Sequence, residues 1–285
     1  MLAEAAACWP DLTARVLAEA GRALDRDLSP WLEEATDARN EDRQLGVFLT
    51  SHIHLLAFER LELTPHASLG LSLGELNHVV DIGAIDFDDA VRLVSARGHA
   101  YDAGPSGTMA AIFPLEESAL IPLLPDGVEI VGFNAPTQHV IAGADEPMRF
   151  VLTRIDEATY ARAVVLGARL PMHHSCFASV CQAYRVALEN VAWKQPDRAY
   201  RPNATGEVEP TPTAELFVTS LARQVCNPVR WRTSIDQVAA ERDDLVFVEV
   251  GPGSVLVDLL RRRWRPEPRA RTARMPELEA VFHAR

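Results

Sequence analysis

Apolar residues in the first third of the chain recur at helical spacing. One helix face is formed by Leu12, Val16, Leu17 and Leu24. Asp11 stands where a capping side chain would begin that helix. A second segment, Leu45–Phe58, is apolar on most sides, which is typical of a helix buried among other elements. The sequence therefore predicts helical packing before any strand.

The next segment changes period around a glycine-rich turn. Ala67–Leu71 is short and apolar, and it predicts a buried strand that leads into a helix near Leu73. Asp86 or Asp88 can then cap a further helix, FDDAVRLVSARG, and Gly98 is expected to end it.

The middle of the chain alternates strands and helices. We expect strands at GTMAAIF, VEIVGFN, HVIAGA and RAVVLG, and helices at PLEESALIPLL and Glu146–Tyr160. The order strand–helix–strand–strand–helix–strand is that of the ferredoxin-like (βαββαβ) arrangement. We therefore divide the chain into a small subdomain, residues 104–171, inserted into a larger α/β domain made of residues 1–103 and 172–285.

The last third predicts two helices and one strong strand. The helices are Phe177–Val191 and Ala214–Gln224, with a proline-rich connection between them. The strand LVFVEV ends in the sequence GPGS.

Composition narrows the class of protein. The chain has 285 residues, 48% of them apolar and 24% charged, which is typical of a globular protein. No apolar run is long enough for a membrane helix, and the N-terminus lacks the features of a secretion signal. The four cysteines form no CxxC pair, so we expect reduced thiols in the cytoplasm and no metal site.

Charge argues against nucleic acid as a partner. The net charge is −12, whereas binding phosphates requires a basic surface. The segment Arg261–Arg274 is the exception, with seven arginines and one acid. It is either a solvated helix end and tail or a docking patch for an acidic partner or phosphates.

The motif GxSxG occurs at Gly70–Gly74, between the predicted strand and the predicted helix. Flanking glycines allow a sharp turn that holds Ser72 in a strained conformation and exposes its hydroxyl. The N–H of Leu73 would then point to where an oxyanion forms, close to a helix N-terminus. The alternative is a glycine-rich turn with an idle serine.

A serine nucleophile needs a base, and the chain has nine histidines. His52 and His54 lie in a buried-helix pattern and are expected to be packing residues. His174, in the sequence PMHHS after the last subdomain strand, is the preferred base, and the adjacent His173 competes with it.

Several spaced blocks carry a resemblance to a known family. They are ASLGLSLGELNHVVDIGAIDFDDAVRLVSARG, GTMAAIF, GFNAPTQHVIAG, PMHHS, NATG, LARQVCNPVRW and FVEVGPGSVL. In this order they resemble malonyl-CoA:acyl-carrier-protein transacylases and the acyltransferase domains of polyketide synthases. The resemblance implies an α/β fold, with an α/β-hydrolase-like core, the ferredoxin-like subdomain, and an active site in the cleft between them.

The resemblance also implies roles for individual residues. Ser72 would be the acyl-enzyme nucleophile, His174 its general base, and Leu73 an oxyanion donor. Arg97 matches the arginine that binds the free carboxylate of a malonyl group, because a guanidinium binds a carboxylate bidentately. Without the resemblance, Arg97 would be interpreted as a helix-end arginine that interacts with the helix dipole.

Further residues are placed in the site by the same resemblance. Asn134 and Gln138 would shape the cleft floor. A backbone carbonyl of the GPG segment would contact His174, because the family uses a Ser–His dyad without a carboxylate.

Three departures from the family pattern bear on activity. Relatives begin with a strand and a GQGxQ loop that supplies a second oxyanion donor, whereas Met1 aligns just after that loop. Either the true start lies upstream or the enzyme is impaired, and the intact remainder of the site favours the first. Leu71 replaces the usual histidine before the serine. His173 stands where relatives have residues that track the choice of acyl group, which leaves that choice open.

We expect an enzyme that moves a malonyl-type group from CoA to the phosphopantetheine thiol of an acyl carrier protein, by a ping-pong mechanism without cofactor or metal. The alternatives are an acyl-thioester hydrolase and a non-catalytic module that binds carrier proteins. The partners implied are an acyl carrier protein and an acyl-CoA, and the resemblance implies a cytoplasmic monomer in fatty acid or polyketide biosynthesis.

Overall fold

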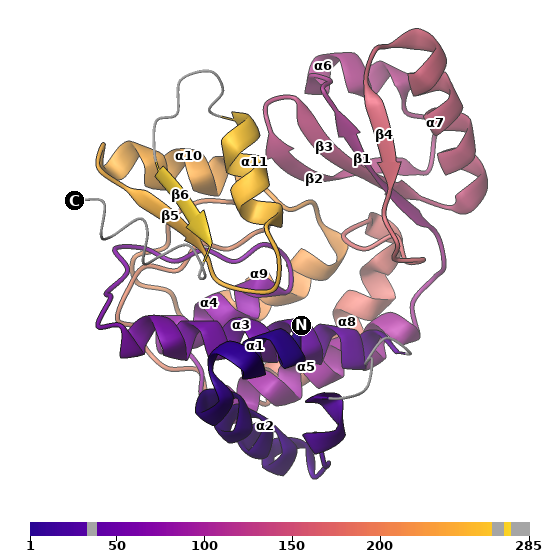
Figure 1. Cartoon of the computed structure of the whole chain (residues 1–285). Helices are drawn as coiled ribbons and strands as arrows, with labels where there is room; N and C mark the ends of the chain where they lie inside the picture. Colours follow the sequence, from indigo (N-terminus) through magenta and orange to yellow (C-terminus); the bar gives the residue numbers. More distant parts are fainter. Residues whose placement is uncertain (33–38, 264–270, 275–285) are drawn as a thin grey trace. The chain divides into compact units, whose positions relative to one another are not determined.

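The structure is a computed structural model (Figure 1), which describes residues 1–32, 39–263 and 271–274, with side chains up to Leu260. The chain divides into two units. Unit 1 contains residues 1–102, 191–200 and 238–285, and unit 2 contains residues 103–190 and 201–237. In the described ranges, no helix has the length and apolar character needed to cross a membrane. The side chains of the arginine-rich segment 261–274 lie outside the described residues.

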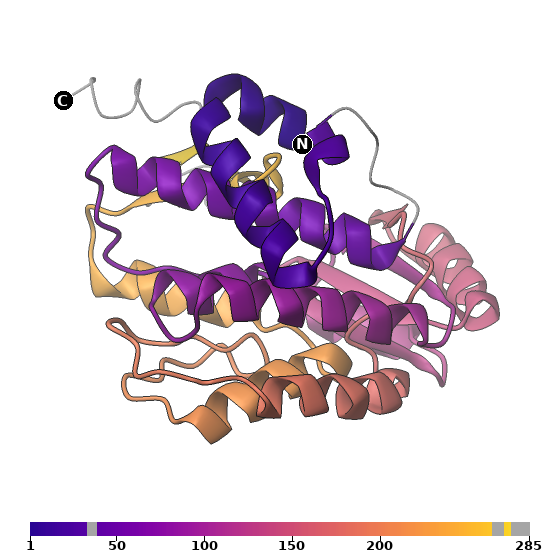
Figure 2. The same ribbon diagram turned by 90° about the horizontal axis from the view of Figure 1, so that it is seen from below.

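Unit 1 consists mainly of helices from the first 102 residues. These are α1 (Leu2–Cys8), α2 (Pro10–Leu24), η1 (Ser29–Leu32), α3 (Asn40–Arg60), α4 (Gly74–Asp81) and α5 (Phe87–Asp102). Helix α3 packs against α1, α2, α4 and α5 (Figure 2). Its side chains Leu45, Phe48 and Ile53 are fully buried. The predicted buried helix is therefore confirmed.

Two local predictions in unit 1 are wrong. Helix α2 begins at Pro10 without a side-chain cap, and Asp11 instead forms an ion pair with Arg60 at 2.5 Å. Helix α5 continues through Gly98 to Asp102. The glycine is needed there for packing, because a Cβ at residue 98 would lie 2.4 Å from the Cα of Glu41. Gly98 thus lets α5 and α3 approach closely rather than ending α5.

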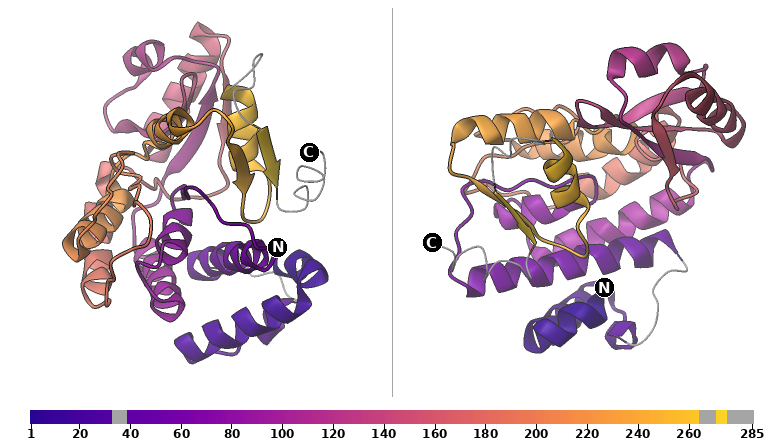
Figure 3. Two further views of the ribbon diagram at one scale, coloured as in Figure 1. Left: turned by 90° about the vertical axis from the view of Figure 1, so that its left-hand side faces the viewer. Right: turned by 45° about the horizontal axis from the view of Figure 1, so that its top comes forward.

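The C-terminal part of unit 1 contributes a parallel pair of strands, β5 (Val246–Glu249) and β6 (Arg271–Arg274), joined through α11 (Val255–Arg263) (Figure 3). Strand β5 confirms the prediction for LVFVEV. The strand predicted at Ala67–Leu71 is not found, because those residues join no strand of the described sheets.

Unit 2 contains an antiparallel sheet of four strands. The strands are β1 (Thr108–Phe113), β2 (Val128–Ala135), β3 (Gln138–Gly143) and β4 (Arg162–Val165). They lie in the order β2-β3-β1-β4. A short α6 (Glu117–Leu120) followed by η2 (Ile121–Leu123) connects β1 to β2, and α7 (Asp145–Ala158) connects β3 to β4. This is the strand and helix order predicted for the ferredoxin-like subdomain.

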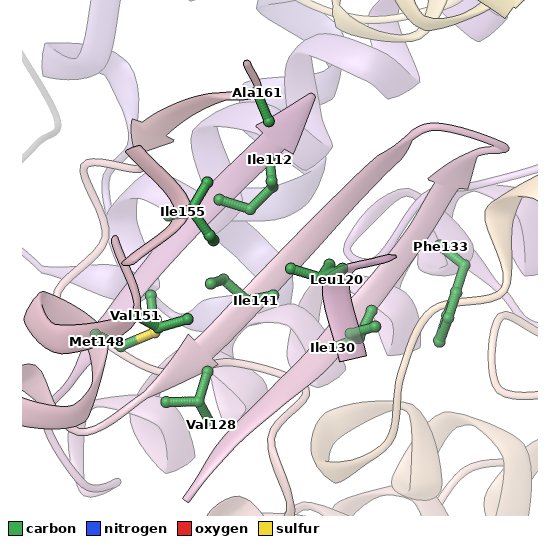
Figure 4. Close-up of a cluster of buried hydrophobic side chains, with 11 residues drawn as sticks. Ile112, Leu120, Val128, Ile130, Phe133, Ile141, Met148, Val151, Ile155 and Ala161 are labelled. Atoms are coloured by element: carbon green, nitrogen blue, oxygen red, sulfur yellow. The ribbon is translucent and has the colours of Figure 1, made fainter. Parts of the chain in front are cut away.

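The core of unit 2 forms where α7 covers one face of this sheet. Ile112 and Ile141 from the strands point toward Met148, Val151 and Ile155 of the helix (Figure 4). Neighbouring strand residues such as Met109 belong to a second cluster, as expected from the two-residue period of a strand. In β1 and β3 the alternation of apolar residues therefore fixes which side of the strand meets α7, whereas all four residues of β4 are exposed.

The remaining elements of unit 2 are η3 (Ser175–Phe177), α8 (Ala178–Glu189), α9 (Ala214–Cys226) and most of α10 (Trp231–Glu241). Val229 exchanges backbone hydrogen bonds with β2, at 2.9 Å to the N–H of Phe133 and 3.0 Å to the carbonyl of Val131. Residues 172–190 and 201–237 thus belong to the unit that contains the sheet, whereas the predicted division placed them in the larger domain.

Candidate active site

Ser72 lies on a tight turn immediately before α4. Its φ is +51°, a left-handed conformation that is costly for a residue with a Cβ and that often marks functional sites. The turn is closed by hydrogen bonds from Gly74 N–H to the carbonyl of Leu71 and from Glu75 N–H to the carbonyl of Ser72, both at 3.0 Å. The strained serine turn predicted from GxSxG is therefore present.

The two glycines of the motif have different roles. A Cβ at Gly70 would lie 2.0 Å from the carbonyl oxygen of Gly74, so only glycine fits at residue 70. A Cβ at Gly74 would meet no atom within 4 Å. The close approach of residue 70 to residue 74 is what makes the turn this sharp.

The backbone next to Ser72 offers a hydrogen-bond donor. In the part of the chain that the structure describes, the N–H of Leu73 has no intramolecular acceptor. Leu73 directly precedes α4, so the positive end of that helix dipole lies beside this donor. Such a donor is suited to an oxyanion on a carbonyl attacked by Ser72.

Arg97 brings a buried positive charge to the serine. It is only 2% exposed, and its Nη2 donates to Ser72 Oγ at 3.1 Å. It lies inside α5, five residues before the last residue of that helix, and its side chain turns toward the serine. The interpretation as a helix-end arginine that interacts only with the helix dipole does not account for these contacts, and the guanidinium stands where it can bind an anion beside Ser72.

Two further residues hold this guanidinium. Gln44, on α3, accepts a hydrogen bond from Arg97 Nη1 at 2.5 Å, and the ring of Tyr101 lies 4.4 Å from the guanidinium carbon. Sequence analysis missed both. Tyr101 follows Arg97 by one helical turn, which is a usable signal, whereas Gln44 lies 53 residues away on another helix.

The imidazole of His173 is oriented by a backbone carbonyl. Its Nδ1 donates to the carbonyl of Gln224 at 2.6 Å, and its backbone N–H donates to the carbonyl of Val225 at 3.1 Å. His173 has a φ of +64°, so it shares the left-handed conformation of Ser72. With the proton on Nδ1, Nε2 carries the lone pair, and this is the tautomer that a general base requires.

His174 uses its ring nitrogens differently. Its Nδ1 accepts a hydrogen bond from the backbone N–H of Cys176 at 3.0 Å and caps η3, while Nε2 donates to the carbonyl of Gly127 at 3.2 Å. The lone pair is therefore engaged by the backbone. The carbonyl that contacts His174 belongs to Gly127, not to the GPG segment. This geometry favours His173 over His174 as a base and reverses the preference drawn from sequence.

A glutamate secures the segment that follows His174. Glu129, on β2, accepts from the backbone N–H of Ser175 at 3.0 Å and from the Ser175 hydroxyl. Its carboxylate also lies 3.7 Å from His174 Nε2. The residues after His173 are thereby attached to the sheet of unit 2.

The other predicted site residues lie near one strand connection. Asn134 is the penultimate residue of β2 and Gln138 the first of β3, next to the tight turn that joins them. Gln138 is buried and Asn134 is half-buried. Their role in shaping a binding cleft stays a prediction.

His52 and His54 serve packing, as predicted. His52 stacks on Phe87 with ring centroids 4.2 Å apart, and burial lowers the pKa of His52 to about 4. Burial likewise lowers the pKa of His54, which a hydrogen bond with the backbone of Gly251 partly offsets. Among the described residues, no three His, Cys, Asp or Glu side chains gather as a metal site would require.

Comparison with known proteins identifies relatives along most of the chain. A family model described as "Acyl transferase domain" matches residues 43–279. The malonyl CoA-acyl carrier protein transacylase of Escherichia coli K12 is 31% identical over 274 residues, which cover 92% of this chain and 87% of that protein. The Haemophilus influenzae protein of the same name is 35% identical over 209 residues, 70% of this chain and 66% of the relative.

Solved structures match the fold over nearly all of the chain. The crystal structure of FabD from Acinetobacter baumannii has a TM-score of 0.88 and 28% identity, covering 100% of this chain and 94% of that one. A type II polyketide synthase acyl carrier protein in complex with its malonyl-transacylase matches with a TM-score of 0.84 and 28% identity, covering 96% and 90%. The α/β-hydrolase-like core with a small subdomain, predicted from sequence, is the fold of these neighbours.

Proposed function

Because this chain belongs to the acyl transferase domain family, we propose that it transfers a malonyl group from CoA to the phosphopantetheine thiol of an acyl carrier protein. Relatives named malonyl CoA-acyl carrier protein transacylase support the reaction. The structural match to a transacylase bound to its carrier protein supports the acceptor.

The observation that carries this proposal is the pairing of Arg97 with Ser72. A buried guanidinium 3.1 Å from a strained serine hydroxyl provides a nucleophile and an anion site side by side. A malonyl thioester has a carbonyl to attack and a carboxylate at the far end of a three-carbon group. The guanidinium binds that carboxylate and so selects a dicarboxylic acyl group over a plain acyl chain.

In the first half-reaction, His173 Nε2 removes the proton of Ser72 Oγ as the oxygen attacks the thioester carbonyl. The tetrahedral oxyanion accepts a hydrogen bond from the N–H of Leu73. The intermediate then expels the CoA thiolate, which takes the proton from His173. The malonyl group is left as an ester on Ser72, and Arg97 retains its carboxylate.

In the second half-reaction the carrier thiol replaces CoA. His173 removes the thiol proton, the sulfur attacks the ester carbonyl, and the same N–H binds the oxyanion. Collapse of the intermediate breaks the bond to Ser72 Oγ, which recovers its proton from His173. These steps use protein side chains and the backbone alone, without cofactor or metal.

Intact-mass measurement of the acyl-enzyme after incubation with malonyl-CoA tests the proposal. The wild-type chain should gain one malonyl group, and Ser72→Ala should gain none. His173→Ala should slow acylation by about 10²–10⁴-fold, the usual contribution of a general base. His174→Asn keeps an acceptor for the cap of η3 and should acylate within about tenfold of the wild-type rate.

The outcomes separate the rival functions. A chain that acylates and then releases free malonate at the same rate with or without carrier protein is a thioester hydrolase. A chain that never acylates, including after addition of an upstream GQGxQ segment, is a carrier-binding module. If His174→Asn abolishes acylation and His173→Ala does not, the assignment of the base is wrong.

A further inference from the structure

Two cysteines of unit 2 meet where α8 and α9 pack together. Cys181 lies in the first turn of α8, and Cys226 is the last residue of α9. Both are half-buried and free, and their thiols interact through a side-chain hydrogen bond. The other two cysteines, Cys8 and Cys176, are exposed. The chain therefore contains one dithiol that solvent can reach.

The two thiols are unequal. The hydrogen bond from Cys226 lowers the pKa of Cys181 to about 7, helped by the positive charges of Arg185 and Arg223. The same hydrogen bond raises the pKa of Cys226, and burial adds to this. Near neutral pH Cys181 is thus partly ionised to the thiolate, while Cys226 stays a protonated thiol. A thiolate beside a second thiol is the arrangement of cysteines that react with oxidants.

The dithiol is attached to both segments that position His173. Cys226 comes two residues after Gln224, whose carbonyl orients the His173 ring, and one after Val225, whose carbonyl binds the His173 N–H. On the other side, α8 begins directly after η3 and so follows His173 closely. If the distance between Cys181 and Cys226 changes, the two backbone carbonyls that hold His173 are therefore expected to move with Cys226.

We propose that Cys181 and Cys226 form a redox modification site, at which a peroxide converts the dithiol to a disulfide and displaces the Gln224 carbonyl from His173. The thiolate of Cys181 attacks one peroxide oxygen, forming a sulfenic acid and releasing hydroxide, which takes a proton from solvent to become water. The thiol of Cys226 then attacks the sulfenic sulfur, and its proton leaves with the hydroxyl group as a second water. Two electrons pass from the sulfurs to the peroxide, and an external thiol reverses the reaction.

A disulfide brings the two sulfurs to about 2.0 Å, closer than a hydrogen-bonded pair of thiols, and in our proposal the end of α9 shifts toward α8 as the bond forms. A displacement of about 1 Å at a positioning group can slow a reaction by about a hundredfold. The effect on activity rests on the proposed function, whereas the disulfide itself does not.

Peptide mapping after treatment of the full chain with hydrogen peroxide tests the site. The expected product is one cross-link between the peptides containing Cys181 and Cys226, with the loss of two hydrogen atoms, reversed by dithiothreitol. The matched control Cys8→Ser/Cys176→Ser retains only the dithiol and should form the same cross-link. Cys181→Ser and Cys226→Ser should form none.

Acylation measured on the same samples tests the link to His173. Oxidation should slow acylation of the wild-type chain roughly tenfold to a hundredfold, and dithiothreitol should restore it. The Cys226→Ser variant should keep its rate in peroxide. If peroxide leaves Cys181 and Cys226 unlinked, the proposed redox site is refuted. If the cross-linked chain acylates at the full rate, the proposed effect of the disulfide on His173 is refuted. If the reduced chain never acylates, the proposed function is refuted, but the peptide mapping still shows whether the disulfide forms.

Discussion

Replacing Gln44 by glutamate would test the proposal that the guanidinium of Arg97 selects a malonyl substrate. The wild-type amide oxygen of Gln44 lies 2.5 Å from Arg97 Nη1 and orients the guanidinium without neutralising it. Gln44→Glu preserves the shape of the side chain and places a negative charge at the same contact. The guanidinium then already has an anionic partner when a malonyl carboxylate arrives.

The size of the effect follows from Coulomb's law. Two charges about 6 Å apart, one on each side of a guanidinium, repel by about 3 kcal/mol at an effective dielectric constant of about 20. Each 1.4 kcal/mol corresponds to about a tenfold change, so kcat/KM for malonyl-CoA should fall about a hundredfold. Acetyl-CoA has no carboxylate, so kcat/KM for its slow transfer should change little.

The assay is kcat/KM for both thioesters with Gln44→Glu and with the neutral control Gln44→Met. The control removes the acceptor but adds no charge, so it should lose much less malonyl selectivity. An equal fall for both thioesters in Gln44→Glu would indicate general damage to the site. An unchanged kcat/KM for malonyl-CoA would refute the role of Arg97 as the carboxylate site.

Two further predictions concern the turn and the core. Gly70→Ala should abolish acylation of Ser72, because the new methyl group would overlap the carbonyl of residue 74. The matched variant Gly74→Ala should acylate normally, and in thermal unfolding it should be more stable than the wild type by up to about 1 kcal/mol. Because the folded-state pKa of His52 is depressed from 6.5 to about 4, its contribution to stability is complete above pH 6.5 and is lost as the pH falls toward 4, by about 3 kcal/mol. Denaturant unfolding should therefore show a shallower loss of stability over this pH range for His52→Leu, and equal slopes would contradict the burial of a neutral ring.

Features that depend on residues close together in the sequence could be predicted from the sequence alone. The strands β1 and β3 and the helix α7 follow from periodicity, because each of these strands buries one face in the core that α7 covers. The turn at Ser72 follows from Gly70, since no other residue fits there. The placement of Arg97 in the site could be predicted only from the family resemblance, because an arginine near the end of a helical segment usually remains in solvent.

Features that depend on distant contacts could not be predicted in this way. Gly98 looks like a helix stop until α3 is packed against it. His173 and His174 are adjacent and alike in sequence, and only their hydrogen-bond partners distinguish them. Those partners, Gln224 and Gly127, lie about fifty residues away in opposite directions along the chain.

The carbonyl that orients His173 has one more consequence for turnover. A carboxylate in that place would hold the imidazolium by its charge, and acid would remove that charge. An amide carbonyl offers only a dipole, which no change of pH can titrate. The carbonyl therefore holds the ring in the same orientation whether the imidazole is neutral or protonated. That suits the proposed mechanism, in which this base takes up a proton and passes it on in both half-reactions.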